Sequence, residues 1–117
     1  SGDTMKFAGI VARPESRFTP EGKQVLTFSV GLYTGGNKEA GYKDRQWIRV
    51  EAWEALAEKW ASLQKGQTVT VSGRPKPPRT WTDKEGKERD AGFEVVAREI
   101  VNGDFERVEL PADEYPF

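Results

Sequence analysis

Apolar and polar side chains alternate along several stretches of the chain, and a period of two is typical of β-strands. The clearest alternation covers residues 24–33, where four large apolar residues share one face: Leu26, Phe28, Val30 and Leu32. The opposite face carries smaller or polar residues, namely Val25, Thr27, Ser29 and Gly31. Residues 68–73 return to this alternation, and the other predicted strands are residues 5–12, 47–53 and 93–101. The pattern therefore predicts five strands.

Residues 47–53 are the stretch around which the chain is organised. As a strand, they place three apolar residues on one face: Ile48, Val50 and Ala52. The other face carries Trp47 and Trp53 with Arg49 and Glu51 between them. Burying these two charges costs several kcal/mol unless each has an ion-pair partner, so this face is expected to be exposed to solvent and is called the wet face. Exposed aromatic clusters mark binding surfaces, and a stacking platform for unpaired bases is one such surface.

The period changes to that of a helix at residues 54–65. Leu56, Trp60 and Leu63 recur at helical spacing, and Gly66 is placed to end the helix. The sequence predicts a short amphipathic helix of about three turns. Trp60 lies on the apolar stripe and is expected to pack against the sheet and not to contact a ligand.

Prolines and glycines predict where the strands end. Proline cannot donate a hydrogen bond to a sheet, so Pro14 is expected to end the first strand or to move it to an edge. Residues 74–79 hold three prolines, three basic residues and no acidic residue, which predicts an edge or the base of a loop. Trp81 precedes a turn at residues 83–87. It either faces a ligand or closes its own hairpin by hydrophobic contact.

The predicted order is three strands, one helix and two strands. An all-β fold with this order is the five-stranded OB barrel with one short helix between strands three and four. Its central strands and two long hairpins form the binding face, and Trp47, Trp53 and Trp81 then fall there. The glycine-rich, charged connection at residues 34–46 carries Lys43 and either contacts a polyanion or is simply a solvated loop.

Composition narrows the possible functions. A chain of 117 residues is expected to form one domain, without a membrane span. It contains no cysteine, which suits a reducing cytosol, and no histidine. These absences remove thiolate metal sites and the commonest general base, and no nucleophile–base pair is visible. We therefore expect neither a metal, nor a cofactor, nor an enzyme.

Charge is distributed unevenly along the chain. Residues 104–117 hold five acidic residues and one basic residue, whereas the remaining 103 residues hold 17 basic and 14 acidic residues. The pattern predicts a mildly basic body with an acidic tail, although scatter in a highly charged sequence is the plain alternative.

Five segments together resemble the bacterial single-stranded DNA-binding protein family: residues 17–22, 47–53, 56–58, 65–73 and 79–83. The resemblance covers about residues 5–103. It implies an OB-fold protein that coats unpaired DNA without sequence preference in replication, recombination and repair. It also implies a cytoplasmic, nucleoid-associated homo-oligomer, a tetramer or a dimer. By matching positions, Trp47, Trp53 and Trp81 are similar to the family's base-stacking aromatics, and Arg49 and Arg79 to its backbone-contacting cations.

Further candidate DNA-binding residues are Arg74, Lys76, Lys43 and Tyr33. Tyr33 is a substitute for the aromatic that the family often has in the loop after strand two, where this chain has Gly35 and Gly36. Two other departures concern the prolines of residues 75–78, which put the usual subunit packing in doubt, and the tail. Only about ten residues separate barrel from tip, whereas family members usually have a long linker, so the tail has a short reach.

The C-terminal residues resemble the family's acidic tip, which recruits replication and repair proteins. The expected partner-binding residues are Asp113, Glu114, Tyr115, Pro116 and Phe117. The predicted organisation is thus an extension or cloning remnant at residues 1–4, an OB domain at 5–103 and a tail at 104–117. The alternative function is an OB-fold protein-interaction or primosome-accessory module, in which the tryptophans bind a polypeptide.

Overall fold

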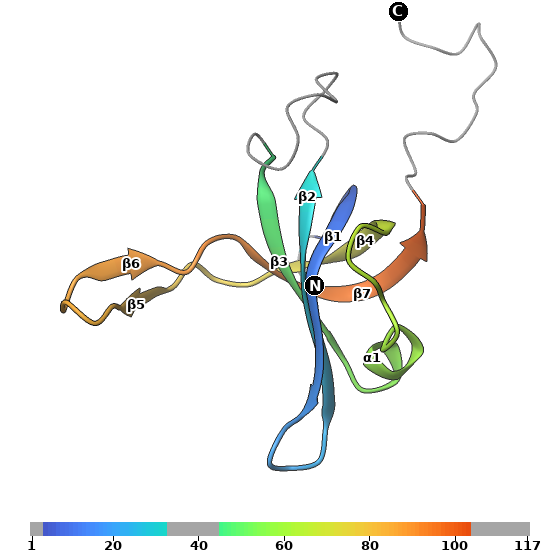
Figure 1. Cartoon of the computed structure of the whole chain (residues 1–117), viewed down its shortest axis with the longest axis horizontal. Coiled ribbons are helices and arrows are strands. Elements are labelled where there is room, and N and C mark those ends of the chain that lie inside the picture. The colour runs from blue at the N-terminus through green and yellow to red at the C-terminus, as the bar shows by residue number, and fades with distance from the viewer. Residues whose placement is uncertain (1–3, 33–44, 104–117) are drawn as a thin grey trace, which may run out of the picture.

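The chain folds into a closed five-stranded barrel in a computed structural model that describes residues 4–32 and 45–103 (Figure 1). The barrel strands are β1 (Met5–Phe18), β2 (Gln24–Leu32), β3 (Trp47–Trp53), β4 (Thr68–Pro75) and β7 (Glu94–Asn102). They are hydrogen-bonded in the order β1-β2-β3-β7-β4, and only the β3–β7 pair is parallel. A short helix, α1 (Ala55–Lys59), follows β3. The predicted all-β OB barrel is confirmed.

Two hairpins project from the barrel in different directions (Figure 1). One is the outer part of β1 and β2, which we call the β1–β2 arm. The other pairs β5 (Thr80–Thr82) with β6 (Glu88–Asp90) in a separate two-stranded sheet, which we call the β5–β6 arm. The prolines at 77 and 78 lie in the connection that leads to this second arm, as expected of residues that cannot donate to a ladder.

The barrel interior is filled by the apolar face of every barrel strand. Its fully buried residues include Val11, Phe28, Val30, Val50, Val69, Val71 and Val95. Ala57 of α1 and Leu63 of the following turns are buried against the same core. Trp60 packs there too, as predicted, although its indole nitrogen is buried without a hydrogen-bond partner.

The β3 pattern has the predicted orientation. Ile48, Val50 and Ala52 are buried, whereas the other four residues of the strand are half-buried or exposed. On β2 the alternation is also present, but two residues of the predicted polar face are buried: Gly31 and Val25, which is only 1% exposed. Val25 is paired in register with both Arg17 and Trp53, and two large neighbours on the same face shield a small side chain.

The helix is shorter than predicted. It has five residues, and the chain then tightens into turns with hydrogen bonds between residues three apart, from Ala61 to Glu58 and from Leu63 to Trp60. Its start lacks a side-chain cap, and Glu54 there has a φ of 54°. A helix this short gains little stability from its own hydrogen bonds, so tertiary contacts decide where it ends. Those contacts are the packing of Leu63 into the core and the return of the chain to β4.

The first strand is longer than predicted. β1 continues past Pro14 to Phe18, and the ladder to β2 shifts register between Ala12 and Glu15. Arg13 has a φ of 52° at this irregularity. A β-bulge leaves one residue unpaired, so it accommodates a proline without ending the strand. No helix in the described part of the chain has the length and apolar character needed to cross a membrane.

Candidate functional site

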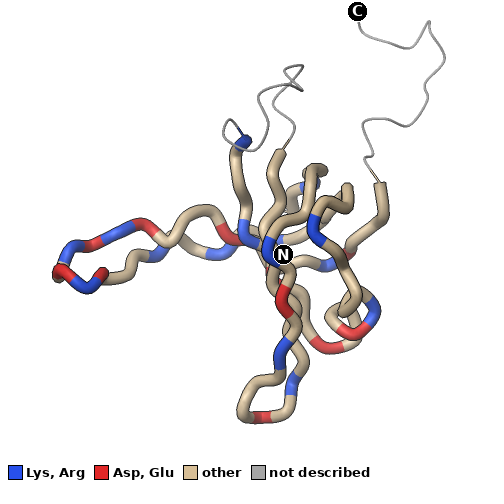
Figure 2. The backbone as a smooth tube through the Cα atoms, viewed as in Figure 1, with Lys and Arg blue, Asp and Glu red and all other residues tan. Residues whose placement is uncertain are grey.

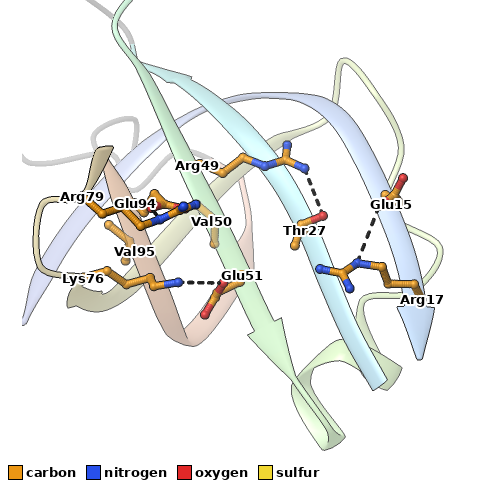
Figure 3. Close-up of a pocket in the computed structure, with 10 residues that line it drawn as sticks. All are labelled: Glu15, Arg17, Thr27, Arg49, Val50, Glu51, Lys76, Arg79, Glu94 and Val95. Carbon is orange, nitrogen blue, oxygen red and sulfur yellow. Dashed lines mark hydrogen bonds and ion pairs between the residues drawn. The ribbon is translucent and has the colours of Figure 1, made fainter. Parts of the chain in front are cut away.

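A hollow of about 370 Å³ lies on the outer face of the barrel between the two arms, and we call it the groove (Figure 3). Its lining residues come from β1, β2, β3, β7 and the β4–β5 connection: Glu15, Arg17, Thr27, Arg49, Val50, Glu51, Lys76, Arg79, Glu94 and Val95. Strand register explains the grouping, because Glu15, Thr27 and Glu51 pair directly across β1, β2 and β3. Ser29, Arg49 and Glu94 form the next row on the same face.

Arg49 is anchored in the middle of this face. Its guanidinium donates to Thr27 Oγ1 at 3.0 Å (Figure 3). It also donates to Ser29 Oγ at 3.1 Å, on the same neighbouring strand. Partial burial is the main cause that lowers the pKa of Arg49 below its usual value, and the nearby Glu15 opposes that shift. Arginine remains charged in proteins, so the structure presents an oriented cation.

The other cations of the groove are paired with carboxylates of the same chain. Arg79 donates to both oxygens of Glu94, at 2.7 and 3.1 Å, and Lys76 Nζ lies 3.3 Å from Glu51 Oε2 (Figure 3). The hydrogen bond from Arg79 lowers the pKa of Glu94, and the same bond raises the pKa of Arg79. A polyanion that enters the groove therefore has to replace these carboxylates at the cations.

The two tryptophans of β3 lie at opposite ends of this face. Trp53 is 37% exposed and donates from Nε1 to Glu51 Oε1 at 3.1 Å. Trp47 is half-buried, which is less exposure than the sequence led us to expect. Its six-membered ring lies over Gly31, since a Cβ added at Gly31 would be 2.8 Å from Trp47 Cη2.

The third predicted tryptophan, Trp81, lies on the β5–β6 arm and outside the lining of the groove. Half of its surface is exposed, and its Nε1 donates to the carbonyl of Asp90 at 3.3 Å. The tip of the arm is held by Asp83, which accepts from the backbone of Glu85 and Lys87 and from Arg89 Nε. These bonds lower the pKa of Asp83, with the bond from Lys87 as the largest cause. Polar contacts thus close the tip of the hairpin.

The remaining predicted residues separate into two sets. Lys76 lines the groove, whereas Arg74 is exposed on β4 opposite Val96 and does not line it. The others lie outside the described residues: Tyr33, Lys43, Asp113, Glu114, Tyr115, Pro116 and Phe117.

Sequence reasoning missed the groove's acidic partners and one aromatic residue. Phe93 is 49% exposed and lines a second hollow of about 260 Å³ with Lys76, Pro78 and Arg79, beside the groove. Its backbone carbonyl accepts from Arg49 N, which fixes it next to β3. The available signal was the sequence Phe93-Glu94 at the start of a strand, where a charge follows an aromatic residue. Among the described residues, no group of three or more potential ligands could hold a metal ion.

Comparisons with known proteins agree with this geometry. The model of the single-strand binding protein family matches residues 4–102. A single-stranded DNA-binding protein of Corynebacterium glutamicum is 37% identical over 109 residues, which is 85% of this chain and 46% of that protein. One from Deinococcus radiodurans is 32% identical over 97 residues, which is 76% of this chain and 30% of that protein. The chain thus spans less than half the length of these two relatives.

A solved structure shares the fold over nearly its whole length. The small single-stranded DNA-binding protein of Streptomyces coelicolor aligns with a TM-score of 0.68 and 26% identity. The alignment covers 87% of this chain and 94% of that one. With a family model that matches from the start of β1 to the end of β7, the assignment follows directly: this chain belongs to the single-strand binding protein family.

Proposed function

We propose that this chain binds single-stranded DNA without sequence preference across the outer face of the barrel. The observation that carries the proposal is the anchored Arg49 between Trp47 and Trp53 on one wet face, in a member of the single-strand binding protein family. Aromatic faces interleaved with cations suit a polymer of flat bases and charged phosphates. On this proposal, residues 5–103 form the DNA-binding domain and residues 104–117 a separate tail.

Bases stack on the indoles of Trp53, Trp47 and Trp81. Each base stacked on an aromatic ring contributes about 1–3 kcal/mol, and every base has a π-face, so stacking tolerates any sequence. Trp53 offers a ring at the end of β3, Trp47 at its beginning and Trp81 on the β5–β6 arm. The hydrogen bond from Trp53 Nε1 to Glu51 holds that ring in place before DNA arrives. A ring that is already ordered costs less entropy to use.

Phosphates contact the cations of the groove. Arg49 is held by two neutral hydroxyl groups, so a phosphate meets its charge directly. Arg79 and Lys76 exchange Glu94 and Glu51 for phosphate, and Arg74 lies beyond the groove on β4. Because phosphate contacts release counterions, affinity falls as salt concentration rises.

Titration with poly(dT) tests the proposal. We expect strong quenching of tryptophan fluorescence, since stacked thymines contact the indoles, and an affinity that falls with added salt. Duplex DNA of the same length should quench far less, because its bases are already stacked. Absence of quenching by poly(dT) would instead favour the protein-interaction module, in which the tryptophans hold a polypeptide.

Replacing Glu94 by glutamine is expected to tighten binding to oligothymidylate by a factor of about two to five, the range of exposed ion pairs. The neutral amide keeps the shape of the side chain but no longer pairs with Arg79, which then meets phosphate without a competitor. The dissociation constant, measured by fluorescence anisotropy at fixed salt, reports the change.

The control for this variant is Glu99→Gln, which removes the same charge from an exposed position on the same strand. It should leave the affinity nearly unchanged. If Glu94→Gln binds more weakly than Glu99→Gln, then Glu94 orients Arg79 toward the DNA and does not compete with it.

The proposal extends to partners and assembly. The acidic residues Asp113 and Glu114, followed by Tyr115, Pro116 and Phe117, bind replication and repair proteins, and the barrel forms a homo-oligomer. The five residues lie outside the described part of the chain, so the support for this proposal is the sequence resemblance. Tyr33 and Lys43 add an aromatic and a cationic contact from the segment between β2 and β3.

A further inference from the structure

A third hollow, also lined by cations, lies beyond Trp47, at the end of β3 away from Trp53. It measures about 400 Å³ and is lined by Ala12, Arg13, Pro14, Trp47 and Lys65. Register places it on the same outer face as the groove, because Ala12 pairs with Ser29, and Ser29 pairs with Arg49. The hollow and the groove are thus consecutive along one face of the sheet. Pockets that hold small ligands have volumes of about 300–1,000 Å³.

Gly31 lets Trp47 reach this hollow. Trp47 and Ile10 flank Gly31 in register on β3 and β1. With no side chain at Gly31, the indole lies across β2 toward β1, and a Cβ there would be 2.8 Å from Cη2 and 2.9 Å from Cζ3. The aromatic ring therefore lines a hollow whose other residues belong to β1 and to the segment before β4.

The backbone places both cationic residues beside this hollow. Arg13 occupies the β1 bulge with a φ of 52°, a conformation that non-glycine residues adopt rarely and that is found at functional sites. Lys65 precedes two residues that are tied to β1: Gly66 N donates to the carbonyl of Val11, and Val11 N donates to the carbonyl of Gln67, both at 2.8 Å. Strand β1 thus brings Arg13 and Lys65 to one site.

The charge of this hollow differs from that of the groove. Arg79, Lys76 and Arg17 each have a carboxylate partner in the groove, whereas Arg13 and Lys65 form no ion pair with any carboxylate among the described residues. The positive charge of Arg13 reaches Arg49, whose pKa it helps to lower. An incoming phosphate displaces no described carboxylate here, so these two cations attract it more effectively than the paired ones.

We infer that this hollow is a further nucleotide subsite, in which one phosphate lies between Arg13 and Lys65 and its base lies against Trp47 and Pro14. The inference rests on the proposed function and extends it. The strand runs from Trp53 past Arg49 to Trp47 and then into the hollow. The subsite adds length to the bound strand and supplies a phosphate contact that requires no internal ion pair to open.

The double variant Arg13→Asn/Lys65→Gln tests the subsite. Asparagine tolerates a positive φ, so the bulge keeps its shape while the charge is removed. Oligothymidylates of about 4 to 16 nucleotides span the site sizes of OB folds. We expect the longer ones to lose affinity by about tenfold, the lower end for charged hydrogen bonds, and the shortest to lose little. The plot of log K against log salt should become shallower by about 0.7, the value for one phosphate.

The matched control is Lys59→Gln/Arg98→Gln, which removes the same charge from exposed residues that line neither hollow. It should retain the affinity and the salt slope. If wild type and Trp53→Ala differ in affinity but the Arg13/Lys65 variant matches the control at every length, the subsite is wrong while the proposed function stands. If wild type binds no oligothymidylate, the proposed function itself fails. Lys65→Gln alone leaves the bulge untouched and should shift the slope in the same direction.

Discussion

The double substitution Trp53→Ala/Trp81→Ala is expected to weaken binding to oligothymidylate by about 2–6 kcal/mol, because each stacked base contributes about 1–3 kcal/mol. The two indoles lie on different elements, at the end of β3 and on the β5–β6 arm. Their indole nitrogens have different hydrogen-bond partners: Trp53 Nε1 donates to Glu51, and Trp81 Nε1 donates to the carbonyl of Asp90. Separate sites without common partners have nearly additive effects, so the two losses should sum.

Anisotropy with the single variants and the double variant measures these losses. Phe18→Ala is the matched control, because it removes an aromatic ring that is 68% exposed on the β1–β2 arm and lines none of the three hollows described above. Circular dichroism should show the same spectrum for every variant. A double variant that keeps its affinity within twofold would rule out stacking on these two rings, and an unfolded Trp53→Ala would make Trp53 a core residue.

The orientation of β3 was predictable because one face of this strand is entirely apolar and the other carries two charged residues. Arg49 and Glu51 could not both be buried at low cost, so the tryptophans beside them had to share the wet face. The structure confirms this, with Ile48, Val50 and Ala52 in the core. The order of strands and helix was equally accessible, since a change in hydrophobic period marks each element. Membership of the family, which comprises non-enzymatic binding proteins, also confirms that the chain is not an enzyme.

The ion pairs of the groove could not be predicted, because they depend on strand register. Arg79 and Glu94 are 15 residues apart in sequence, and Lys76 and Glu51 are 25 residues apart. Only closure of the barrel, with β7 beside β3, brings these residues together. The same closure explains why the further candidate cations, which had no matching family position, included both Lys76, which lines the groove, and Arg74, which lies outside it.

The interleaved charges change what drives binding. Basic and acidic residues follow one another along residues 83–90 of the β5–β6 arm, and the groove cations face carboxylates (Figures 2 and 3). A phosphate that has to replace a carboxylate contributes less binding free energy than a phosphate that contacts an unpaired cation. On the proposed function, we therefore expect stacking to supply a large share of the affinity, and the salt dependence to come mainly from Arg49 and from the inferred Arg13/Lys65 subsite.

Phe28→Ala is expected to lower the free energy of unfolding by about 3–5 kcal/mol, the range for buried phenylalanine. Phe28 is fully buried at the centre of β2, where it pairs with Val50, and its loss leaves a cavity between strands that cannot move independently in a closed barrel. Urea denaturation measures the change. Phe18→Ala is again the control, since the same truncation at an exposed site should change stability by less than about 0.5 kcal/mol.

The same substitution also links the core to the groove. Phe28 lies between Thr27 and Ser29, whose hydroxyl groups hold the guanidinium of Arg49 on the other face of the strand. A strand that relaxes into the cavity shifts both hydroxyl groups, so Phe28→Ala should weaken DNA binding even at temperatures where it is still folded. If folded Phe28→Ala keeps full affinity, then Arg49 does not depend on its anchor in β2, and the DNA itself orients the guanidinium.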